Sequence, residues 1–279
     1  MSMNFALIGK GGVGKTFVAA HLSLAMAESG LRTLLVGCDQ KHDTHRMLTR
    51  QPMSSLMDEL RVRGFVHDEL PLEAVAVFHS EHLHVMELGA SPLLSGSYST
   101  VLDEAFQTFD ALDLWNRYDC IVFDVTEERF DGSHMALFRR VERGLLIMDE
   151  SPESMFITNR MMRAALIGAH EFKTRLKLIG LVNNRSTHPQ RFEQFAETTR
   201  LFPLLSIPQH PWLATLKPRQ ENLFTAQNLP PDAKAVREGF VTLSNLVRGV
   251  NPSILPLNPL FDEDMWRLAA GMINTPPAN

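Results

Sequence analysis

Short apolar runs alternate with longer segments in which apolar residues recur every three or four positions. Uninterrupted apolar runs are typical of parallel strands buried on both faces, and the wider spacing is typical of amphipathic helices. The expected strands cover residues 5–8, 33–36, 83–88, 118–124, 145–148, 176–182 and 204–208. The expected helices cover residues 17–28, 52–63, 152–169, 233–247 and 261–272. Since strands and helices alternate, we expect an α/β fold with a mostly parallel central sheet of about seven or eight strands and helices on both faces.

The connecting segments predict no boundary between domains. Residues 89–99 are rich in Ser and Gly and should form a loop, and the three prolines of residues 252–259 predict an extended connection. No internal repeat, low-complexity tract or interdomain linker is recognisable. We therefore expect a single domain over residues 1–274 and a loose C-terminal tail over residues 275–279.

The first expected strand leads into the octet Gly9-Lys10-Gly11-Gly12-Val13-Gly14-Lys15-Thr16, which opens onto an expected helix. A strand, a glycine-rich turn and a helix N-terminus form the phosphate-binding loop of P-loop NTPases. Lys15 would reach the β and γ phosphates, and the Thr16 hydroxyl would hold Mg²⁺. The alternative, an ordinary glycine-rich turn, does not require the full octet. The residues expected to contact ATP or ADP in this loop are Gly11, Gly12, Val13, Gly14, Lys15, Thr16 and Phe17.

Lys10 is a second lysine in this loop, which can be built without it. Its position suggests a cation aimed at a phosphate outside its own loop, as an arginine finger is. Such an arrangement is most easily made across a dimer interface. The sequence therefore predicts a homodimer.

Polar residues follow several of the expected strands. Asp39, Lys41 and Asp43 come directly after the second strand, and Asp124 ends a later one. Open α/β sheets bind ligands at the carboxyl ends of their strands, so these residues are candidates for phosphate chemistry, although loop charges are often merely solvated. An acid that ends a strand beside a phosphate loop usually binds Mg²⁺, directly or through water. Asn184 follows the strand at 176–182, where its amide could recognise a purine ring.

Composition excludes several classes of function. The hydrophobic fraction is 44%, the charged fraction is 21% and the net charge is −5, so no overall basic field favours nucleic acid or anionic lipid. No apolar run approaches the ~20 residues of a membrane span. The N-terminus leads straight into the first expected strand, so we expect no signal peptide. With only two cysteines, a disulfide framework is not expected, and we predict a cytoplasmic protein.

The octet, residues 36–44 and the Asp124-Val125 strand end resemble the nitrogenase iron protein. They also resemble its relatives, the ATP-dependent reductase subunits of protochlorophyllide and chlorophyllide reduction. The similarity continues through residues 180–185 and the proline-rich C-terminal segment, so that it spans nearly the whole chain. The wider class includes the partition and septum-positioning ATPases, which share the lysine at position 10.

The resemblance implies a role for each matching residue. Lys10 would reach the nucleotide phosphates of the opposite subunit, and Asn184 would contact the base. Asp39 would position or activate the attacking water. The implied catalytic residues are Lys10, Lys15, Asp39 and Lys41; the implied Mg²⁺ ligands, in part through water, are Thr16, Asp43 and Asp124; and the implied switch residues are Asp39, Asp43, Asp124 and Glu128.

The sequence departs from that family at the cluster ligands. Iron proteins of this family hold one [4Fe–4S] cluster between two subunits, each of which supplies two cysteine thiolates. Here residues 89–99 contain serines but no cysteine, and Asp131 occupies about the second ligand position. Cys38 and Cys120 lie in apolar strand runs and are expected to be core residues. Because hydroxyl and carboxylate groups replace thiolates poorly, we expect no [4Fe–4S] cluster.

Three hypotheses follow. The favoured one is a Mg²⁺- and ATP-dependent homodimeric switch without a cluster that acts on a protein partner, such as a nitrogenase-like catalytic component or an assembly target. The second is a genuine electron-donating reductase subunit. The third is a positioning ATPase that binds DNA or membrane, which the acidic residues Asp262, Glu263 and Asp264 of the last helix disfavour for anionic lipid.

Overall fold

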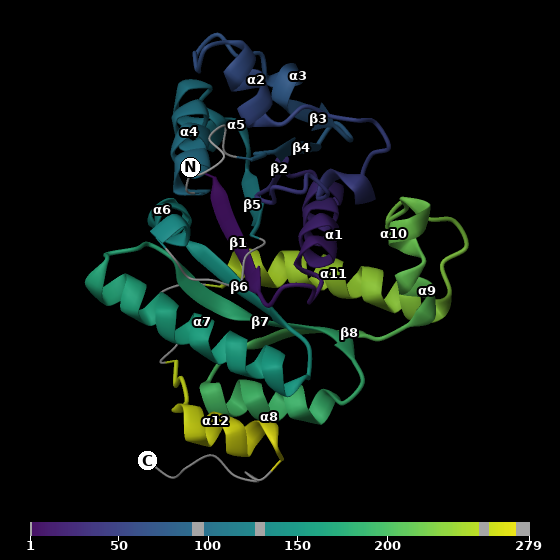
Figure 1. Cartoon of the computed structure of the whole chain (residues 1–279). Coiled ribbons are helices and arrows are strands. Elements are labelled where there is room, and N and C mark those ends of the chain that lie inside the picture. The colour runs from purple at the N-terminus through teal and green to yellow at the C-terminus, as the bar shows by residue number, and fades with distance from the viewer. Residues whose placement is uncertain (1, 91–97, 126–131, 251–256, 272–279) are drawn as a thin grey trace.

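The computed structural model describes residues 2–90, 98–125, 132–250 and 257–271. Its centre is an eight-stranded sheet in the order β3-β4-β2-β5-β1-β6-β7-β8 (Figure 1). All pairings are parallel except the one between β3 and β4. The strands are β1 (Met3–Gly9), β2 (Thr33–Gly37), β3 (Ala76–Phe78), β4 (Leu83–Glu87), β5 (Cys120–Asp124), β6 (Arg143–Met148), β7 (Lys177–Ser186) and β8 (Pro203–Pro208).

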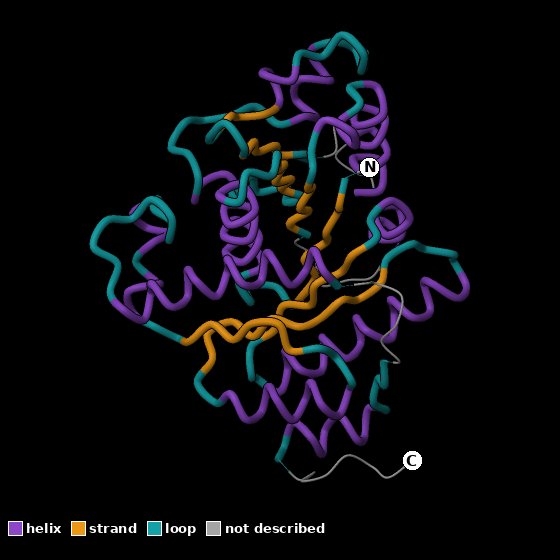
Figure 2. Tube along the Cα trace, turned by 180° about the vertical axis from the view of Figure 1, so that it is seen from behind, coloured by secondary structure: helices purple, strands orange, loops and turns teal. Residues whose placement is uncertain are grey.

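Helices cover both faces of this sheet. The short helices are η1 (His45–Met47), α2 (Leu56–Val62), α3 (Leu72–Val75), α5 (Leu114–Arg117), α9 (Pro211–Ala214) and α10 (Leu216–Arg219). The longer ones are α1 (Lys15–Glu28), α4 (Tyr98–Ala111), α6 (Gly132–Arg140), α7 (Pro152–Glu171), α8 (Pro189–Thr199), α11 (Pro231–Gly249) and α12 (Asp262–Ala269). Seen from behind, the long helix α11 lies across the sheet, and α1 packs against it at a steep angle (Figure 2).

Successive side chains along each strand point to opposite faces of the sheet, and an apolar core lies on each face. On β1, Phe5 and Leu7 point into the core beneath α1 and α11, whereas Ala6 and Ile8 point into the core beneath α4 and α7. Both sets are fully buried. The central strands are therefore apolar on both faces, which explains why each reads as a continuous apolar run.

The expected α/β fold and its mostly parallel sheet are confirmed. All seven expected strands are present, although β5 begins two residues later than expected and β7 runs on to Ser186. The eighth strand, β3, was not expected. It is a three-residue antiparallel edge strand whose last residue, Phe78, is 47% exposed, so it lacks the apolar run that marks the central strands.

Other differences concern helices and loops. Residues 89–99 are not all loop, because Tyr98 and Ser99 already belong to α4, and neither α4 nor α8 was expected. Most of the predicted extended connection at 252–259, and the predicted tail at 275–279, lie outside the described residues. None of the helices in the described ranges combines the length and the apolar character that crossing a membrane requires.

Candidate functional site

The phosphate-loop octet lies between the end of β1 and the start of α1. Gly12 and Gly14 adopt positive φ angles of 74° and 96°, a backbone region that L-residues with a side chain seldom occupy. A Cβ on Gly14 would also collide with the side-chain amide of Asn184. The octet therefore has the tight curvature that directs backbone N–H groups towards an anion.

Lys15 lies inside this loop. Its side chain is buried, and Nζ donates hydrogen bonds to the carbonyl oxygens of Gly9 at 2.7 Å and Lys10 at 3.0 Å. These contacts come from the loop itself, so they hold the ammonium group within the curve of the predicted phosphate loop. The position of the ammonium group fits the predicted role of Lys15.

Asp124 ends β5 and is fully buried next to the loop. The hydroxyl groups of Thr16 and Thr44 form hydrogen bonds with its carboxylate, the second at 2.9 Å. Burial raises the pKa of Asp124 to about 6, although these two hydrogen bonds and the charge of Lys15 act in the opposite direction. The other carboxylate oxygen, Oδ1, is buried and has no hydrogen-bond partner in the described part of the chain.

This arrangement fits Mg²⁺. A buried carboxylate with an unpartnered oxygen, beside the Thr16 hydroxyl, supplies the oxygen ligands that this cation prefers. No group of three or more His, Cys, Asp and Glu residues that could hold a metal ion is found among the described residues. Mg²⁺ would therefore depend on Thr16, water and the phosphates of a nucleotide for most of its ligands.

Asp39, Lys41 and Asp43 lie in the segment that follows β2, which we call the switch segment (residues 39–43). The Lys41 backbone N–H donates to Asp39 Oδ1 at 2.9 Å, and the Lys41 side chain is exposed. Asp43 Oδ2 lies 3.2 Å from Nζ of Lys217 in α10. Of the three predicted Mg²⁺ ligands, the structure thus joins Thr16 and Asp124 by a hydrogen bond and places Asp43 in an ion pair.

Lys10 projects from the loop towards the start of α7. Its Nζ lies 2.9 Å from a carboxylate oxygen of Glu153, whose side chain is 71% exposed. In the single chain, Lys10 therefore contacts the surface of its own subunit.

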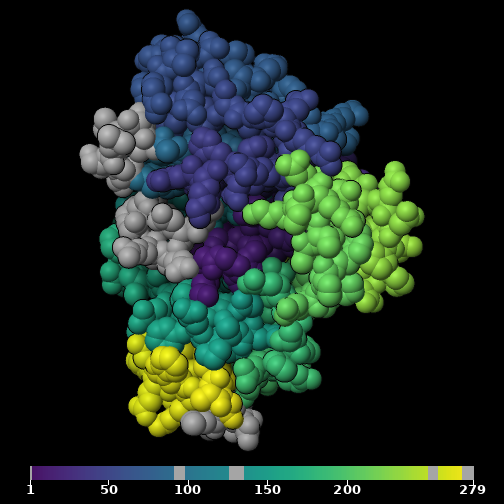
Figure 3. Space-filling model, turned by 45° about the vertical axis from the view of Figure 1, so that its right-hand side comes forward, coloured from purple at the N-terminus to yellow at the C-terminus, as the bar shows by residue number. Residues whose placement is uncertain are grey.

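A cleft of about 270 Å³ adjoins the phosphate loop. Its residues come from the loop, from the end of β7 and from the segment after β8, and Figure 3 shows the N-terminal segment recessed between neighbouring lobes. Asn184 is buried there, and its Nδ2 donates to the carbonyl oxygen of Val13 at 2.8 Å. The lining residues are Gly14, Phe17, Asn184, Arg185, Pro208, Gln209, His210, Leu213, Ala214 and Lys217.

This cleft has the character of a base site. Phe17, Pro208 and Leu213 offer apolar surface to a flat ring, and Asn184 and Gln209 offer amide groups to its edge. The cleft thus brings together two predicted nucleotide-binding residues, Phe17 and Asn184, that are far apart in sequence.

Several residues of this site were missed from the sequence. Arg185 Nη2 donates to the carbonyl oxygen of Gly12 at 2.9 Å and pairs with Asp149 at 3.0 Å. Glu87 ends β4, is fully buried and accepts hydrogen bonds from His45. An acidic residue at the end of an apolar strand was the signal that identified Asp124, and the same signal could have identified Glu87.

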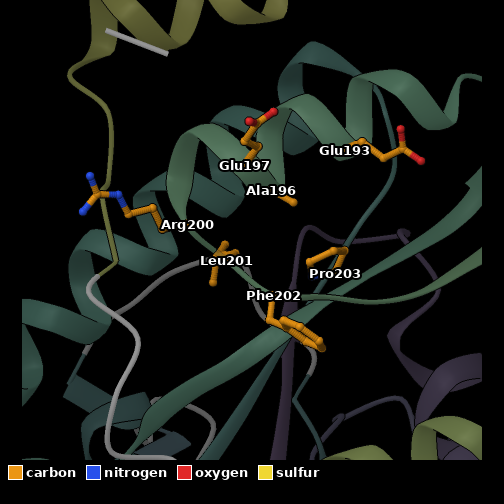
Figure 4. Close-up of a pocket in the computed structure, with 7 residues that line it drawn as sticks. All are labelled: Glu193, Ala196, Glu197, Arg200, Leu201, Phe202 and Pro203. Atoms are coloured by element: carbon orange, nitrogen blue, oxygen red, sulfur yellow. The ribbon is translucent and has the colours of Figure 1, made fainter. Parts of the chain in front are cut away.

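A second hollow lies away from this site, at the amino end of β8 (Figure 4). It is lined by Glu193, Ala196, Glu197, Arg200, Leu201, Phe202 and Pro203. The phosphate loop is at the opposite, carboxyl edge of the sheet, so this hollow is not part of the nucleotide site.

The cysteines do not fit a [4Fe–4S] cluster. Cys38 and Cys120 are the only two in the chain, and they are 3% and 0% exposed. Burial raises the pKa of both thiols, that of Cys120 to about 11, which disfavours the thiolate form that iron requires. The predicted switch residue Glu128, and Asp131 at the second ligand position, lie outside the described residues.

Comparison with known proteins gives relatives over the full chain. The "Light-independent protochlorophyllide reductase iron-sulfur ATP-binding protein" of Chlorobium phaeobacteroides is 27% identical over 276 residues, which cover 97% of this chain and 99% of the relative. The protein with the same name from Rubrivivax gelatinosus is 29% identical over 265 residues, which cover 95% of this chain and 86% of the relative.

Solved structures share the fold at lower identity. The MinD cell division protein of Aquifex aeolicus matches with a TM-score of 0.66 and 18% identity, over 92% of this chain and 100% of that one. The septum site-determining protein MinD of Pyrococcus horikoshii, complexed with Mg-ADP, matches with a TM-score of 0.65 and 19% identity, over 89% and 97%. These matches show the P-loop NTPase fold.

A family model described as "4Fe-4S iron sulfur cluster binding proteins, NifH/frxC family" matches residues 3–269. This range includes the phosphate loop, the switch segment, Asp124 and Asn184. Because the match extends over nearly the whole sequence, the chain belongs to the NifH/frxC family.

Proposed function

We propose that this chain is a Mg²⁺- and ATP-dependent ATPase that works as a homodimeric switch, carries no [4Fe–4S] cluster and couples ATP binding and hydrolysis to a partner protein. The observation that carries the proposal is the placement of Lys15, Thr16 and Asp124 together at the carboxyl edge of the sheet. The P-loop NTPase fold of the relatives and the phosphate loop of this chain support the same reaction.

In this proposal, hydrolysis rests on positioning and on neutralising charge. Lys15 and the loop N–H groups hold the phosphates, and Asp39 orients the attacking water. Thr16 and Asp124 would hold Mg²⁺, and the ion would supply positive charge to the phosphate oxygens. Asp43 and Lys41 belong to the same switch, and Lys10 acts on the nucleotide of the opposite subunit. A partner reads the two states because it binds one of them more tightly.

The absence of a cluster is supported by the cysteines. A cluster shared by two subunits needs ligands at the surface where the subunits meet, and both thiols of this chain lie buried in or directly after strands of the central sheet. The proposed partner is a nitrogenase-like catalytic component or an assembly target, as expected from the sequence. The proposal also includes a cytoplasmic location and a single domain.

A second candidate is an electron-donating reductase subunit, which the names of the relatives favour. In that case Cys38, Cys120 or a partner must supply the ligands. A third candidate is a positioning ATPase, which the likeness to MinD suggests at the level of the fold. The three acidic residues at the start of α12 weigh against binding to anionic lipid.

Phosphate release by the purified protein tests the proposal. We expect hydrolysis that needs both ATP and Mg²⁺, and an ATP-dependent dimer in light scattering. Lys15→Gln should abolish hydrolysis, whereas Lys234→Gln, which changes an exposed lysine of α11, should leave it unchanged. Failure of the wild-type protein to bind or hydrolyse ATP would refute the proposal.

A further inference from the structure

Glu87 lies behind the switch segment and outside the nucleotide cleft. It is the last residue of β4, and its side chain is 0% exposed. Its Oε1 accepts two hydrogen bonds from one residue, His45, one from the backbone N–H and one from ring Nδ1, both at 2.8 Å. Two bonds to the same residue fix both the main chain and the ring of His45.

Thr44, the residue before His45, is anchored to β5, which lies on the other side of β2 from β4. Thr44 Oγ1 donates to Asp124 at the end of β5, while His45 is bound to Glu87 at the end of β4. Both strands flank β2, and Gly37 is opposite Glu87 on one side and opposite Asp124 on the other. Two consecutive residues directly after the switch segment are therefore attached to two strand ends.

The packing around Gly37 shows how closely these groups approach. A Cβ on Gly37 would collide with Oε2 of Glu87 and would lie 2.8 Å from Oγ1 of Thr44. The absence of a side chain on Gly37 therefore leaves the space that the Glu87 carboxylate and the Thr44 hydroxyl both occupy.

Stability alone does not explain this carboxylate. Oε2 of Glu87 is buried without a hydrogen-bond partner in the described ranges, and a buried acid with an unsatisfied oxygen is costly. A well-packed apolar residue at such a position is often equally stabilising or better. What the carboxylate supplies and an apolar residue does not is the pair of bonds that place His45.

We propose that Glu87 is a positioning residue for nucleotide hydrolysis: by holding His45 it fixes the end of the switch segment, so that Thr44 reaches Asp124 and Asp39 is presented to the phosphates. This inference rests on the proposed ATPase function and extends it to a residue that lines no part of the nucleotide cleft. Because Glu87 does not touch the nucleotide, its loss lowers kcat and leaves nucleotide affinity nearly unchanged.

Three variants separate positioning from general damage. Glu87→Met keeps the volume and removes both acceptor bonds, so kcat should fall by ~10- to 100-fold, the scale of a misplaced catalytic group, while KM and the Kd of a fluorescent ATP analogue stay within about threefold. Glu87→Gln keeps an oxygen that His45 can reach and should restore most of kcat. His45→Leu removes only the ring donor and should give a smaller loss in the same direction.

Asn159→Leu is the matched control. It also removes two buried hydrogen bonds to one residue, the backbone of Leu260, both at 2.9 Å, but on α7 away from the phosphate loop. It should lower Tm and leave kcat unchanged. The proposal is overturned if folded Glu87→Met has the kcat of the wild type. It is also overturned if the Kd of the ATP analogue rises by the same factor by which kcat falls and Glu87→Gln restores neither value.

Hydrogen exchange on the nucleotide-free protein tests the positioning without hydrolysis. The backbone amide of His45 should exchange slowly in the wild type and at least about tenfold faster in Glu87→Met, since its acceptor is gone. Equal exchange in the two proteins would overturn the inference. If the wild type hydrolyses no ATP, the proposed function fails, and this exchange measurement still decides whether Glu87 holds the segment.

Discussion

Lys217 Nζ lies 3.2 Å from Asp43 Oδ2, and this ion pair joins the switch segment to the wall of the nucleotide cleft. Lys217 belongs to α10, 174 residues further along the chain than Asp43. Asp43 must leave this partner if it is to approach Mg²⁺, as the family resemblance implies. If Asp43 binds Mg²⁺ as proposed, this ion pair would compete with metal binding.

Replacing Lys217 should make Mg²⁺ bind more tightly. The lysine side chain is 63% exposed, and an exposed pair contributes about 0.2–1 kcal/mol, which corresponds to a roughly 1.4- to 5-fold change in an equilibrium constant. We expect Lys217→Gln to lower the Mg²⁺ concentration at half-maximal ATP hydrolysis by that factor. Arg61→Gln, which breaks the exposed pair with Asp58 in α2, is the control and should change nothing. A higher Mg²⁺ requirement in Lys217→Gln would contradict the competition.

Glu153 should restrain dimer formation. It holds Lys10 at 2.9 Å in the single chain, whereas the proposed function needs Lys10 at the opposite subunit. We expect Glu153→Gln to tighten the ATP-dependent dimer by a few fold, because the ion pair between half-buried Lys10 and exposed Glu153 is lost only from the monomer. Lys10→Gln should bind ATP and fail to dimerise. Light scattering with and without ATP measures both, and a dimer of unchanged affinity in Glu153→Gln would argue against a cross-subunit role for Lys10.

Asn184 should control both affinity and choice of base. Its amide nitrogen donates one of its two hydrogens to the carbonyl oxygen of Val13, and its oxygen can accept a hydrogen bond from the amino group of adenine. Asn184→Ala removes this acceptor and leaves the buried Val13 carbonyl unpaired. We expect an ~5- to 20-fold weaker ATP affinity and a smaller preference for ATP over GTP, measured by calorimetry. Gln209 also lines the cleft, so Gln209→Ala is the comparison. If the preference for ATP over GTP depends on Asn184, Gln209→Ala should keep that preference.

Asp124→Asn should abolish hydrolysis and yet stabilise the metal-free protein at neutral pH. Burial raises the pKa of Asp124 from 3.8 to about 6. Its folded pKa therefore lies above its unfolded pKa, so the ionised carboxylate destabilises the fold above pH 6 by about 3 kcal/mol, and this cost disappears as the pH falls towards 4. Thermal unfolding in EDTA should show a Tm gain of several degrees at pH 7.5 and almost none at pH 4.5.

Glu150→Gln serves as the comparison, because at neutral pH it should destabilise the fold, whereas Asp124→Asn should stabilise it. Burial tends to raise the pKa of Glu150, but hydrogen bonds from Ser186, Asn183 and the backbone of residues 187–188 lower it to about 2. Its ionised form thus stabilises the fold above about pH 4.5, and that contribution is lost as the pH falls towards 2. The variant should lose stability at pH 7.5. For Asp124→Asn, a lower Tm than that of the wild type at both pH 7.5 and pH 4.5 would contradict the prediction that the ionised Asp124 carboxylate destabilises the fold.

Iron should not bind in stoichiometric amount. Both thiols are buried with raised pKa values, so protein purified anaerobically and treated with iron and sulfide should remain colourless. Visible absorption and iron analysis measure this directly. A [4Fe–4S] signal at one cluster per dimer would favour the electron-donating reductase instead, and loss of that signal in Cys38→Ala or Cys120→Ala would identify the ligands.

The sequence was most informative where the signal is local. The phosphate loop and its flanking strand and helix need only neighbouring residues, and Asp124 is an acid at the end of an apolar run. Asp43 and Glu87 depend instead on partners remote in sequence: Lys217 for the first, and His45, 42 residues away, for the second. The position at a strand end could have marked Glu87 as a candidate, but no pattern within a short window encodes its contact with His45, which emerges only when β4 is placed beside β2.

The helices illustrate the same limit. Helix α1 follows a recognisable loop, whereas α4 follows residues whose Ser and Gly content suggested a longer loop. Its buried face, with Val101, Leu102 and Phe109, is explained by the core beneath the sheet that it covers. For Asn184 the amide was expected to face a base, and its contact with the carbonyl oxygen of Val13 arises because β7 runs past the phosphate loop.

Thr44 and His45 are adjacent residues, and they are bound to the ends of β5 and β4, respectively, so neither set of hydrogen bonds can lengthen far without disturbing the other. We therefore expect the segment between β2 and η1 to exchange between two arrangements, one with both sets of hydrogen bonds formed and one with both broken. A form with only one set broken should not be populated. A protein built in this way turns a graded supply of ATP into a binary output in each molecule, and relaxation-dispersion spectra of His45 would fit a single exchange process.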